Sequence, residues 1–269
     1  MKNLWILLPL CLLLACSPSD DTVDDSAPED NQDPVESVLT ESLVALGVAY
    51  GDDPRQYVDI YKAASACPTP LYFDAHGNGG TTAMPNSIVE ELNAAGISVI
   101  AWESLTSVNT QEEVETGWND AELMFAWVMA NAQAYNFDTS NIIIGGSSRG
   151  SILSWKYGHN GTAGIKGLYM YNALPGNTWA DPDWWYPPND VSADAPPIQF
   201  VYRREPGSST DADDPDIHDP DFGYIIMETY EDLGIGEKAA LVHSIGETDN
   251  TDKYQFLLDF ALPLLDDCQ

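Results

Sequence analysis

The sequence is poor in basic residues. Its 269 residues include 10 Lys and Arg against 43 Asp and Glu, which gives a formal net charge of -33. So negative a chain repels other polyanions at long range, and this argues against nucleic acid as a partner. The apolar fraction of 44% is nevertheless ample for one sizeable hydrophobic core. We therefore expect a single globular domain that does not bind nucleic acid.

Long apolar runs are also scarce, and the clearest is at the start of the chain. Leu4–Leu14 follows one early cation, Lys2, and the small residue Ala15 separates it from Cys16. The run is too short to span a bilayer as a mature helix, but it has the size of the core of a secretory signal. We expect a signal peptide at 1–15, and the alternative to lipidation is an ordinary signal cut nearby.

The end of this segment resembles a bacterial lipobox, in which the cysteine receives a lipid. The resemblance implies lipidation of Cys16. Ser17 follows the cysteine where aspartate would favour retention in the inner membrane. We therefore expect a secreted protein that is lipid-anchored in the bacterial cell envelope, at the outer membrane, on its periplasmic or surface face.

The next stretch lacks both basic residues and apolar periodicity. From Ser17 to about Glu41 the charges are all acidic. Low hydrophobicity and charge of one sign cannot offset the entropy lost on ordering. We therefore expect residues 16–48 to form a disordered acidic tether, and residues 49–269 to form the folded domain.

Cysteine is rare, and two of the four residues lie in or next to the signal segment. Cys67 and Cys268 remain for the mature domain. In an oxidising compartment two leftover thiols are more often paired than free, so we expect a disulfide between them. Two unpaired thiols are the alternative, because proximity cannot be read from sequence.

Strand-like and helix-like segments alternate through the rest of the chain. The expected strands lie at 57–61, 70–75, 97–102, 142–145, 165–174, 198–202 and 238–245, and the expected helices lie at 87–95, 112–134, 222–233 and 254–265. Such alternation predicts an α/β fold with a mostly parallel sheet covered by helices on both faces. In sheets of this kind, reactive groups gather beyond the carboxyl ends of the strands.

The most informative stretch is a β-branched strand followed by a tight turn and a helix-like segment. Ile142–Gly145 leads into Gly146-Ser147-Ser148-Arg149-Gly150. Small flanking residues let the strand and helix approach closely while the serine hydroxyl is exposed at the apex. The motif resembles the nucleophile elbow of α/β-hydrolases of the bacterial esterase and lipase type. The resemblance implies an α/β-hydrolase fold with Ser148 as the nucleophile.

A glycine-rich loop, His76-Gly77-Asn78-Gly79-Gly80, follows an early strand. It resembles the His-Gly-Gly-Gly loop of esterases and lipases, with asparagine in place of one glycine. Glycines allow backbone N–H groups to turn toward a developing oxyanion. The resemblance implies an oxyanion hole from the amides of Gly77, Asn78 and Gly79, together with the amide of Arg149, and a bracing role for His76.

The family places its triad acid after the strand expected at 198–202. Several acidic residues follow that strand, and Asp214 best matches the family's acid loop, with Asp216 and then Glu205 as alternatives. The acid would fix the tautomer of the catalytic imidazole. The run of aspartates offers Ca²⁺ ligation as another interpretation, although it lacks the spaced glycine of a known calcium loop.

The expected position of the general base is vacant, because the loop 246–251 contains no histidine. His243 lies slightly earlier, in the expected last strand, and keeps the order Ser, Asp, His along the chain. We take His243 as the base and His218 as the reserve candidate. The missing histidine also leaves a second function open, an inactive α/β-hydrolase that serves as a binding module.

The resemblance implies a serine carboxylesterase that works through an acyl-enzyme and requires no metal or other cofactor. Its substrate would be a small-molecule or glycan ester, and the sequence leaves the oligomeric state open. The segment 175–197 is rich in proline and tryptophan and is expected to form a cap. Its aromatic rings either wall the substrate site or pack the cap onto the body.

Overall fold

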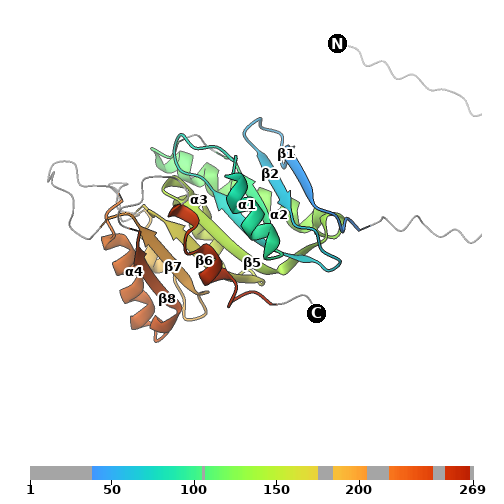
Figure 1. The fold of residues 1–269 in the computed structure, drawn as a ribbon. Helices are drawn as coiled ribbons and strands as arrows, with labels where there is room; N and C mark the ends of the chain where they lie inside the picture. Colours follow the sequence, from blue (N-terminus) through green and yellow to red (C-terminus); the bar gives the residue numbers. More distant parts are fainter. Residues whose placement is uncertain (1–37, 105–106, 175–183, 205–217, 245–251, 267–269) are drawn as a thin grey trace, which may run out of the picture. The chain divides into compact units, whose positions relative to one another are not determined.

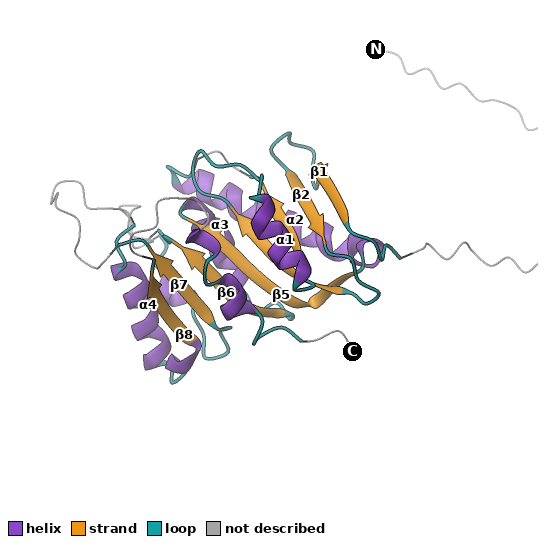
Figure 2. Cartoon of the chain, viewed as in Figure 1, coloured by secondary structure: helices purple, strands orange, loops and turns teal. Residues whose placement is uncertain are grey.

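One eight-stranded sheet organises the domain (Figures 1 and 2). The computed structural model describes residues 38–104, 107–174, 184–204, 218–244 and 252–266. The strands are β1 (Leu43–Ala49), β2 (Tyr57–Lys62), β3 (Thr69–Ala75), β4 (Ser98–Trp102), β5 (Phe137–Ser147), β6 (Ile165–Tyr171), β7 (Ile198–Tyr202) and β8 (Ala239–His243). The helices are α1 (Asn86–Ala94), α2 (Gln111–Tyr135), α3 (Arg149–His159), α4 (Asp221–Asp232) and α5 (Leu257–Ala261), and three short 3₁₀ turns are η2 (Pro187–Asp190), η3 (Gly236–Lys238) and η4 (Asp252–Tyr254).

The strands follow the order β1-β2-β4-β3-β5-β6-β7-β8. β2 pairs antiparallel with both β1 and β4, and every other neighbouring pair is parallel. β5 lies between β3 and β6, where the run Ile142–Ile144 is completely buried. A strand covered on both faces reads as a continuous apolar run, so this sequence suits the centre of a parallel sheet. The predicted mostly parallel α/β sheet is confirmed.

Helices cover both faces of the sheet, as Figure 1 shows. α2, α3 and α4 pack on one face, in the larger hydrophobic cluster. α1 and α5 pack on the other face, with Ile88, Leu92 and Leu257 in the second cluster. Apolar residues on one side of each helix produce this burial. The sheet therefore lies between the two helical layers.

The folded part begins earlier than predicted. β1 starts at Leu43 and pairs antiparallel with β2, whereas the sequence placed the domain boundary at Ala49. β1 is an edge strand whose outward residues Val44 and Leu46 are 61% and 64% exposed. Pairing with a partner downstream, and not a local alternating pattern, holds this strand in place. Residues 43–48 therefore belong to the domain and not to the tether.

Several other predictions lie outside the described residues. These are the signal peptide, the lipidated Cys16 and Cys268, so that the pairing of Cys268 with Cys67 stays a prediction. Within the described part of the chain, no helix combines the length and the apolar character needed to cross a membrane. The last helix, α5, is shorter than the predicted 254–265, because Tyr254 belongs to the 3₁₀ turn η4.

Candidate active site

Ser148 lies at the apex of the turn between β5 and α3, with φ of 50° and ψ of −118°. This backbone conformation is rare for a residue that carries a side chain and indicates local strain of the kind found at functional sites. Small neighbours make the turn possible, because a Cβ at Gly146 would lie 2.6 Å from the carbonyl oxygen of Gly150. A Cβ at Gly150 would overlap the carbonyl of Ala75. The predicted strand, sharp turn and helix are confirmed.

The structure places His218 against the serine. Its Nε2 atom lies 3.0 Å from the Oγ of Ser148, within hydrogen-bond reach. His218 precedes α4, in the connection that follows β7. Burial lowers the pKa of His218 below its ordinary value, and the positive charge of Arg204 lowers it further. A neutral imidazole next to the hydroxyl is the form that can accept its proton.

His243 does not take the predicted position of the base. Its Nδ1 lies 2.7 Å from the carbonyl oxygen of Arg204, and its Nε2 lies 3.3 Å from the hydroxyl of Tyr224. β8 is the third strand away from β5 in the sheet, which is about 14 Å at about 4.8 Å per strand. A side chain at the end of β8 itself cannot cross that distance. The structure therefore does not bring His243 to Ser148, and the reserve candidate His218 lies there instead.

The acid of a triad falls outside the described residues. Asp214, the first choice, and Asp216 and Glu205, the alternatives, all belong to the segment 205–217. The calcium interpretation concerns the same segment. The acid assignment and the calcium alternative therefore stay predictions.

The glycine-rich loop lies directly against the elbow. A Cβ on Gly77 would be 3.2 Å from the Cβ of Ser148, so the loop backbone approaches the serine more closely than a side chain would allow. Gly80 N donates to the carbonyl of Gly77 over 3.0 Å, and Gly79 adopts a positive φ of 70°. The amide of Arg149 belongs to the first turn of α3, where amides have no acceptor within the helix. Gly77 and Arg149 thus flank Ser148, and Asn78 and Gly79 continue the loop.

A buried ion pair supports this loop from behind. Nε2 of His76 lies 2.8 Å from Oε2 of Glu103, and its Nδ1 lies 2.8 Å from the carbonyl of Gly77. The guanidinium of Arg149, which is 1% exposed, lies 3.4 Å from Oε1 of Glu103 and 3.3 Å from the carbonyl of His76. The bracing role implied for His76 therefore has a geometric basis.

Electrostatics hold the same cluster together. Burial lowers the pKa of Arg149, and the charge of Glu103 opposes that shift. Burial alone would raise the pKa of Glu103, but its hydrogen bond with His76 and the charge of Arg149 leave that pKa below its ordinary value. Sequence reasoning missed Glu103. Its position directly after β4, at the carboxyl edge of the sheet, was the available signal.

The described part of the predicted cap packs onto the body. Trp118 of α2 stacks with Trp184 at 5.7 Å between ring centroids and meets Trp185 edge-on at 5.0 Å. Nε1 of Trp185 donates to Asp190 over 2.7 Å, and Asp190 pairs with Lys156 of α3. For these two tryptophans the packing interpretation is favoured over a substrate wall.

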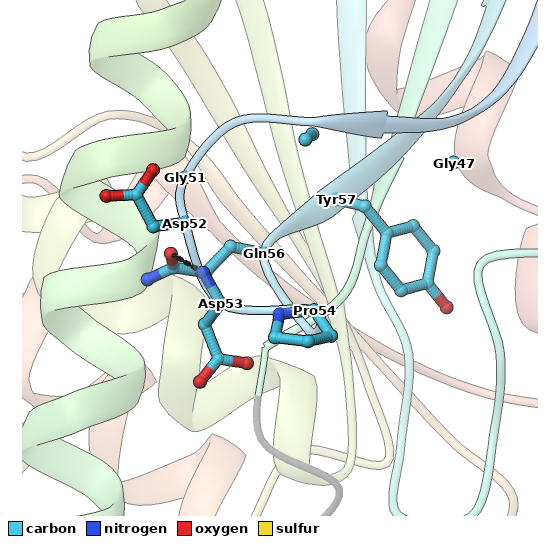
Figure 3. A pocket seen from close by; sticks show the side chains of 8 residues that line it. Gly47, Gly51, Asp52, Asp53, Pro54, Gln56 and Tyr57 are labelled. Carbon is cyan, nitrogen blue, oxygen red and sulfur yellow. Dashed lines mark hydrogen bonds between the residues drawn. The ribbon is translucent and has the colours of Figure 1, made fainter.

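Two cavities differ sharply in what lines them. One, of about 390 Å³, lies beside the elbow and is bordered by Ser147, Gly77 and the rest of the glycine-rich loop. The other, of about 310 Å³, lies in the β1–β2 hairpin between Gly47 and Tyr57, where Gln56 accepts a hydrogen bond from the amide of Asp53 (Figure 3). The hairpin cavity has neither a nucleophile nor an imidazole among its lining residues. The first cavity is lined by His76 and by Ser147, the residue before Ser148.

The structure is similar to several solved esterases. A truncated form of a carbohydrate esterase from gut microbiota shares 18% identity over 84% of this chain and 97% of that chain, with a TM-score of 0.61. Esterase 2 of Thermogutta terrifontis, phosphorylated by paraoxon, shares 15% identity over 84% of this chain and 96% of that chain, with a TM-score of 0.62. A putative carboxylesterase from Lactobacillus plantarum shares 14% identity over 84% and 98%, with a TM-score of 0.60.

The comparisons by sequence found no related protein. No protein-family model matches the chain, and no curated protein matches it. At identities of 14 to 18% the structural likeness establishes the fold and nothing finer. The eight-stranded sheet, the flanking helices and the match to the esterases agree on one architecture. The chain has the α/β-hydrolase fold.

Proposed function

We propose that the protein is a serine hydrolase that cleaves carboxylic esters. The observation that carries the proposal is the contact of 3.0 Å between His218 Nε2 and Ser148 Oγ, at the apex of a strained strand-to-helix turn. A nucleophile within hydrogen-bond reach of a base is the signature of activated-serine chemistry. The names of the structural neighbours, which include a carbohydrate esterase and a carboxylesterase, favour an ester over other acyl substrates.

The reaction then follows the geometry of the site. His218, whose pKa is lowered by burial, takes the proton of Ser148 while Oγ adds to the ester carbonyl. The amides of Gly77, which lies against Ser148, and of Arg149, which follows it, are the proposed donors to the oxyanion. His218 returns the proton to the leaving alcohol, and water releases the acyl group by the same steps in reverse order. No step requires a metal or an organic cofactor.

The binding-module alternative rested on the missing histidine after the last strand. His218 supplies an imidazole from a different connection, which supports hydrolysis over that alternative. The positive φ of Ser148, together with an imidazole at 3.0 Å, is the further support for hydrolysis. We therefore keep hydrolysis as the proposed function.

Covalent labelling tests the proposal. The full-length protein, treated with a fluorophosphonate probe, should carry the label on Ser148, and the Ser148→Ala and His218→Gln variants should lose it. Hydrolysis of p-nitrophenyl acetate should fall by about 10⁴-fold or more in both variants, the scale seen when a triad serine or histidine is removed. His243→Gln is the matched control and should retain labelling. A folded wild-type protein that takes no label would overturn the proposal.

The acid can be assigned in the same assay. Of the variants Asp214→Asn, Asp216→Asn and Glu205→Gln, one should lose about 10⁴-fold in kcat, as expected when the imidazole is left in the wrong tautomer. We propose Asp214 for this role. If all three variants kept the activity of the wild type, none of the three residues would be the triad acid.

We also propose that the mature protein is anchored through Cys16 to the envelope of a bacterial cell. The short apolar run before Cys16 supports this proposal. A clickable palmitate fed to the producing cells should label the wild-type protein and not Cys16→Ala, which should leave the membrane fraction. Label retained in the variant would refute it.

A further inference from the structure

The backbone of Ser148 is held at both of its polar groups. Its amide donates to the carbonyl of Tyr171, at the end of β6, over 3.0 Å. Its carbonyl accepts two hydrogen bonds from Ser151, one from the backbone amide at 2.9 Å and one from the side-chain hydroxyl at 2.6 Å. A residue with side chain at φ of 50° keeps this conformation only where the surrounding structure determines it. These three hydrogen bonds meet that requirement.

The hydroxyl of Ser151 also joins two segments that are separate in the sequence. Ser151 lies in the first turn of α3 and is 2% exposed. Its Oγ donates to the carbonyl of Ser148, and the same oxygen accepts from the amide of Leu174, just after β6, over 3.1 Å. A hydroxyl has one donor and two acceptor positions, so it makes both contacts at once. Hydrogen bonds thus lead from the end of β6 through Ser151 to the residue at the apex of the elbow.

The direction of the Ser148 carbonyl determines the direction of the next amide. That carbonyl and the N–H of Arg149 belong to one planar, trans peptide group, in which they point in opposite directions. Because Ser151 holds the carbonyl toward the first turn of α3, the N–H of Arg149 points away from that turn. An amide in the first turn has no acceptor within its helix, so this N–H can donate to a ligand.

The same hydrogen bonds polarise the peptide group. Hydrogen bonds in a chain strengthen one another. Here Leu174 donates to Ser151, and Ser151 donates to the carbonyl that shares its peptide group with the N–H of Arg149. An amide at the end of such a chain is a stronger donor than an isolated one. A donor that stabilises an oxyanion needs both this strength and a fixed direction.

We propose that Ser151 is a positioning residue for ester hydrolysis, which directs the amide of Arg149 at the oxyanion through the carbonyl of Ser148. The inference rests on the proposed function and adds a residue to it. When Oγ of Ser148 adds to the ester carbonyl, the carbonyl oxygen gains a negative charge, and the Arg149 amide is one of its proposed donors. The hydroxyl of Ser151 acts on this step only through the peptide group between Ser148 and Arg149.

The Ser151→Ala variant removes the hydroxyl and keeps the residues that react. We expect kcat and kcat/KM for p-nitrophenyl acetate to fall together, by about tenfold to a hundredfold, because a misdirected donor costs less than a deleted one. Ser154→Ala is the matched control. Ser154 also lies in α3, is 1% exposed, and donates to the carbonyl of Gly145 over 3.0 Å. Its loss should leave both constants within about twofold of the wild type.

A second measurement separates positioning from a general loss of stability. Sulfur accepts hydrogen bonds more weakly than oxygen, so a thionoester depends less on the oxyanion donors than the oxygen ester does. The ratio of kcat/KM for p-nitrophenyl acetate to that for p-nitrophenyl thionoacetate should fall by about threefold or more in Ser151→Ala. In Ser154→Ala this ratio should stay at the wild-type value.

Urea denaturation shows whether each variant is folded. If Ser151→Ala is not folded, Ser151→Cys replaces it in the same comparison, and the expected change is smaller, because a thiol is a weak donor.

The variants and the wild type give separate answers. A fall in both the rate and the oxygen-to-sulfur ratio in the Ser151 variant, and in neither for Ser154→Ala, supports the inference. Equal constants in the two variants, or a lower rate in the Ser151 variant at an unchanged ratio, would overturn the inference, while an active wild type would still support ester hydrolysis. A folded wild type that neither hydrolyses p-nitrophenyl acetate nor takes the fluorophosphonate label would overturn both.

Discussion

Two buried ion pairs flank the glycine-rich loop, and they are built differently. Glu103 and Arg149 lie on one side, together with His76, and each has several hydrogen-bond partners within the protein. Asp74 and Lys253 lie on the other side, where both line the cavity beside the elbow. The first pair is closed off behind the loop, whereas the second borders a space that a ligand can enter.

This difference separates a pair that is enclosed by protein groups from a pair that borders a cavity. A charged group whose partners all belong to the protein can hold the backbone in one conformation. Here Arg149 and His76 contact the carbonyls of His76 and Gly77, and so hold the glycine-rich loop against Ser148. The pair of Asp74 and Lys253 instead borders the cavity beside the elbow. Removing one member of each pair should therefore give different losses.

The largest loss is expected for Glu103→Gln. Arg149 would remain buried without a counter-charge, and the loss of one partner from a buried pair costs about 3 to 5 kcal/mol in free energy of unfolding. Urea denaturation should show the lower midpoint, with Glu90→Gln on the exposed side of α1 as the control near the wild type. A midpoint equal to that of the control would mean that the Glu103 cluster does not support the fold.

The second pair should respond less to the same kind of change. Lys253→Met leaves the Asp74 carboxylate buried and unpaired, but the side chain of Lys253 is 12% exposed, so we expect a loss of about 2 to 3 kcal/mol. The double variant Asp74→Asn/Lys253→Met removes both charges and should recover most of it. Additive losses in the double variant, measured in urea, would show that the two residues act independently.

The Arg204→Gln substitution should shift the acid limb of the plot of log kcat/KM against pH. Arg204 disfavours the protonated imidazole and so helps to lower the pKa of His218 from its ordinary value of 6.5. Without that positive charge the pKa of His218 rises. At a given pH below neutrality, a larger fraction of the protein then carries a protonated His218, which cannot accept the proton of Ser148. The limb of log kcat/KM should therefore shift to higher pH. A limb that stays in place in the variant would argue against His218 as the titrating base.

The smallest effect is expected at the hairpin cavity. Arg55 pairs with Asp53 over 3.0 Å, but both side chains are well exposed, and exposed pairs contribute little to stability. Arg55→Gln should change neither the urea midpoint nor kcat/KM. A fall in kcat/KM would assign a role to the cavity in Figure 3 that its lining does not suggest.

The sequence was most informative where function and fold depend on neighbours in the chain. The elbow around Ser148, the loop His76–Gly80 and the alternating strands and helices are local patterns, and the structure places them as predicted. The strand β1 was missed, because an edge strand is held by pairing and not by its own periodicity.

The site was harder to predict where it joins distant segments. His218 and Ser148 are 70 residues apart, and the order of residues expected from the family favoured His243 instead. Glu103 contacts residues 27 and 46 positions away, and Lys253 contacts one 179 positions away. No local pattern reports such pairings, because the order of strands in the sheet determines which loop ends meet.

The conformation of Ser148 has a consequence for laboratory evolution. Its positive φ of 50° is held against the preference of a residue with a side chain, at a cost of about 1 to 3 kcal/mol. Glycine at this position would relax the turn and delete the proposed nucleophile in one step. A screen that rewards only thermal resistance would thus select against catalysis here, so variants must be sorted for turnover at every round.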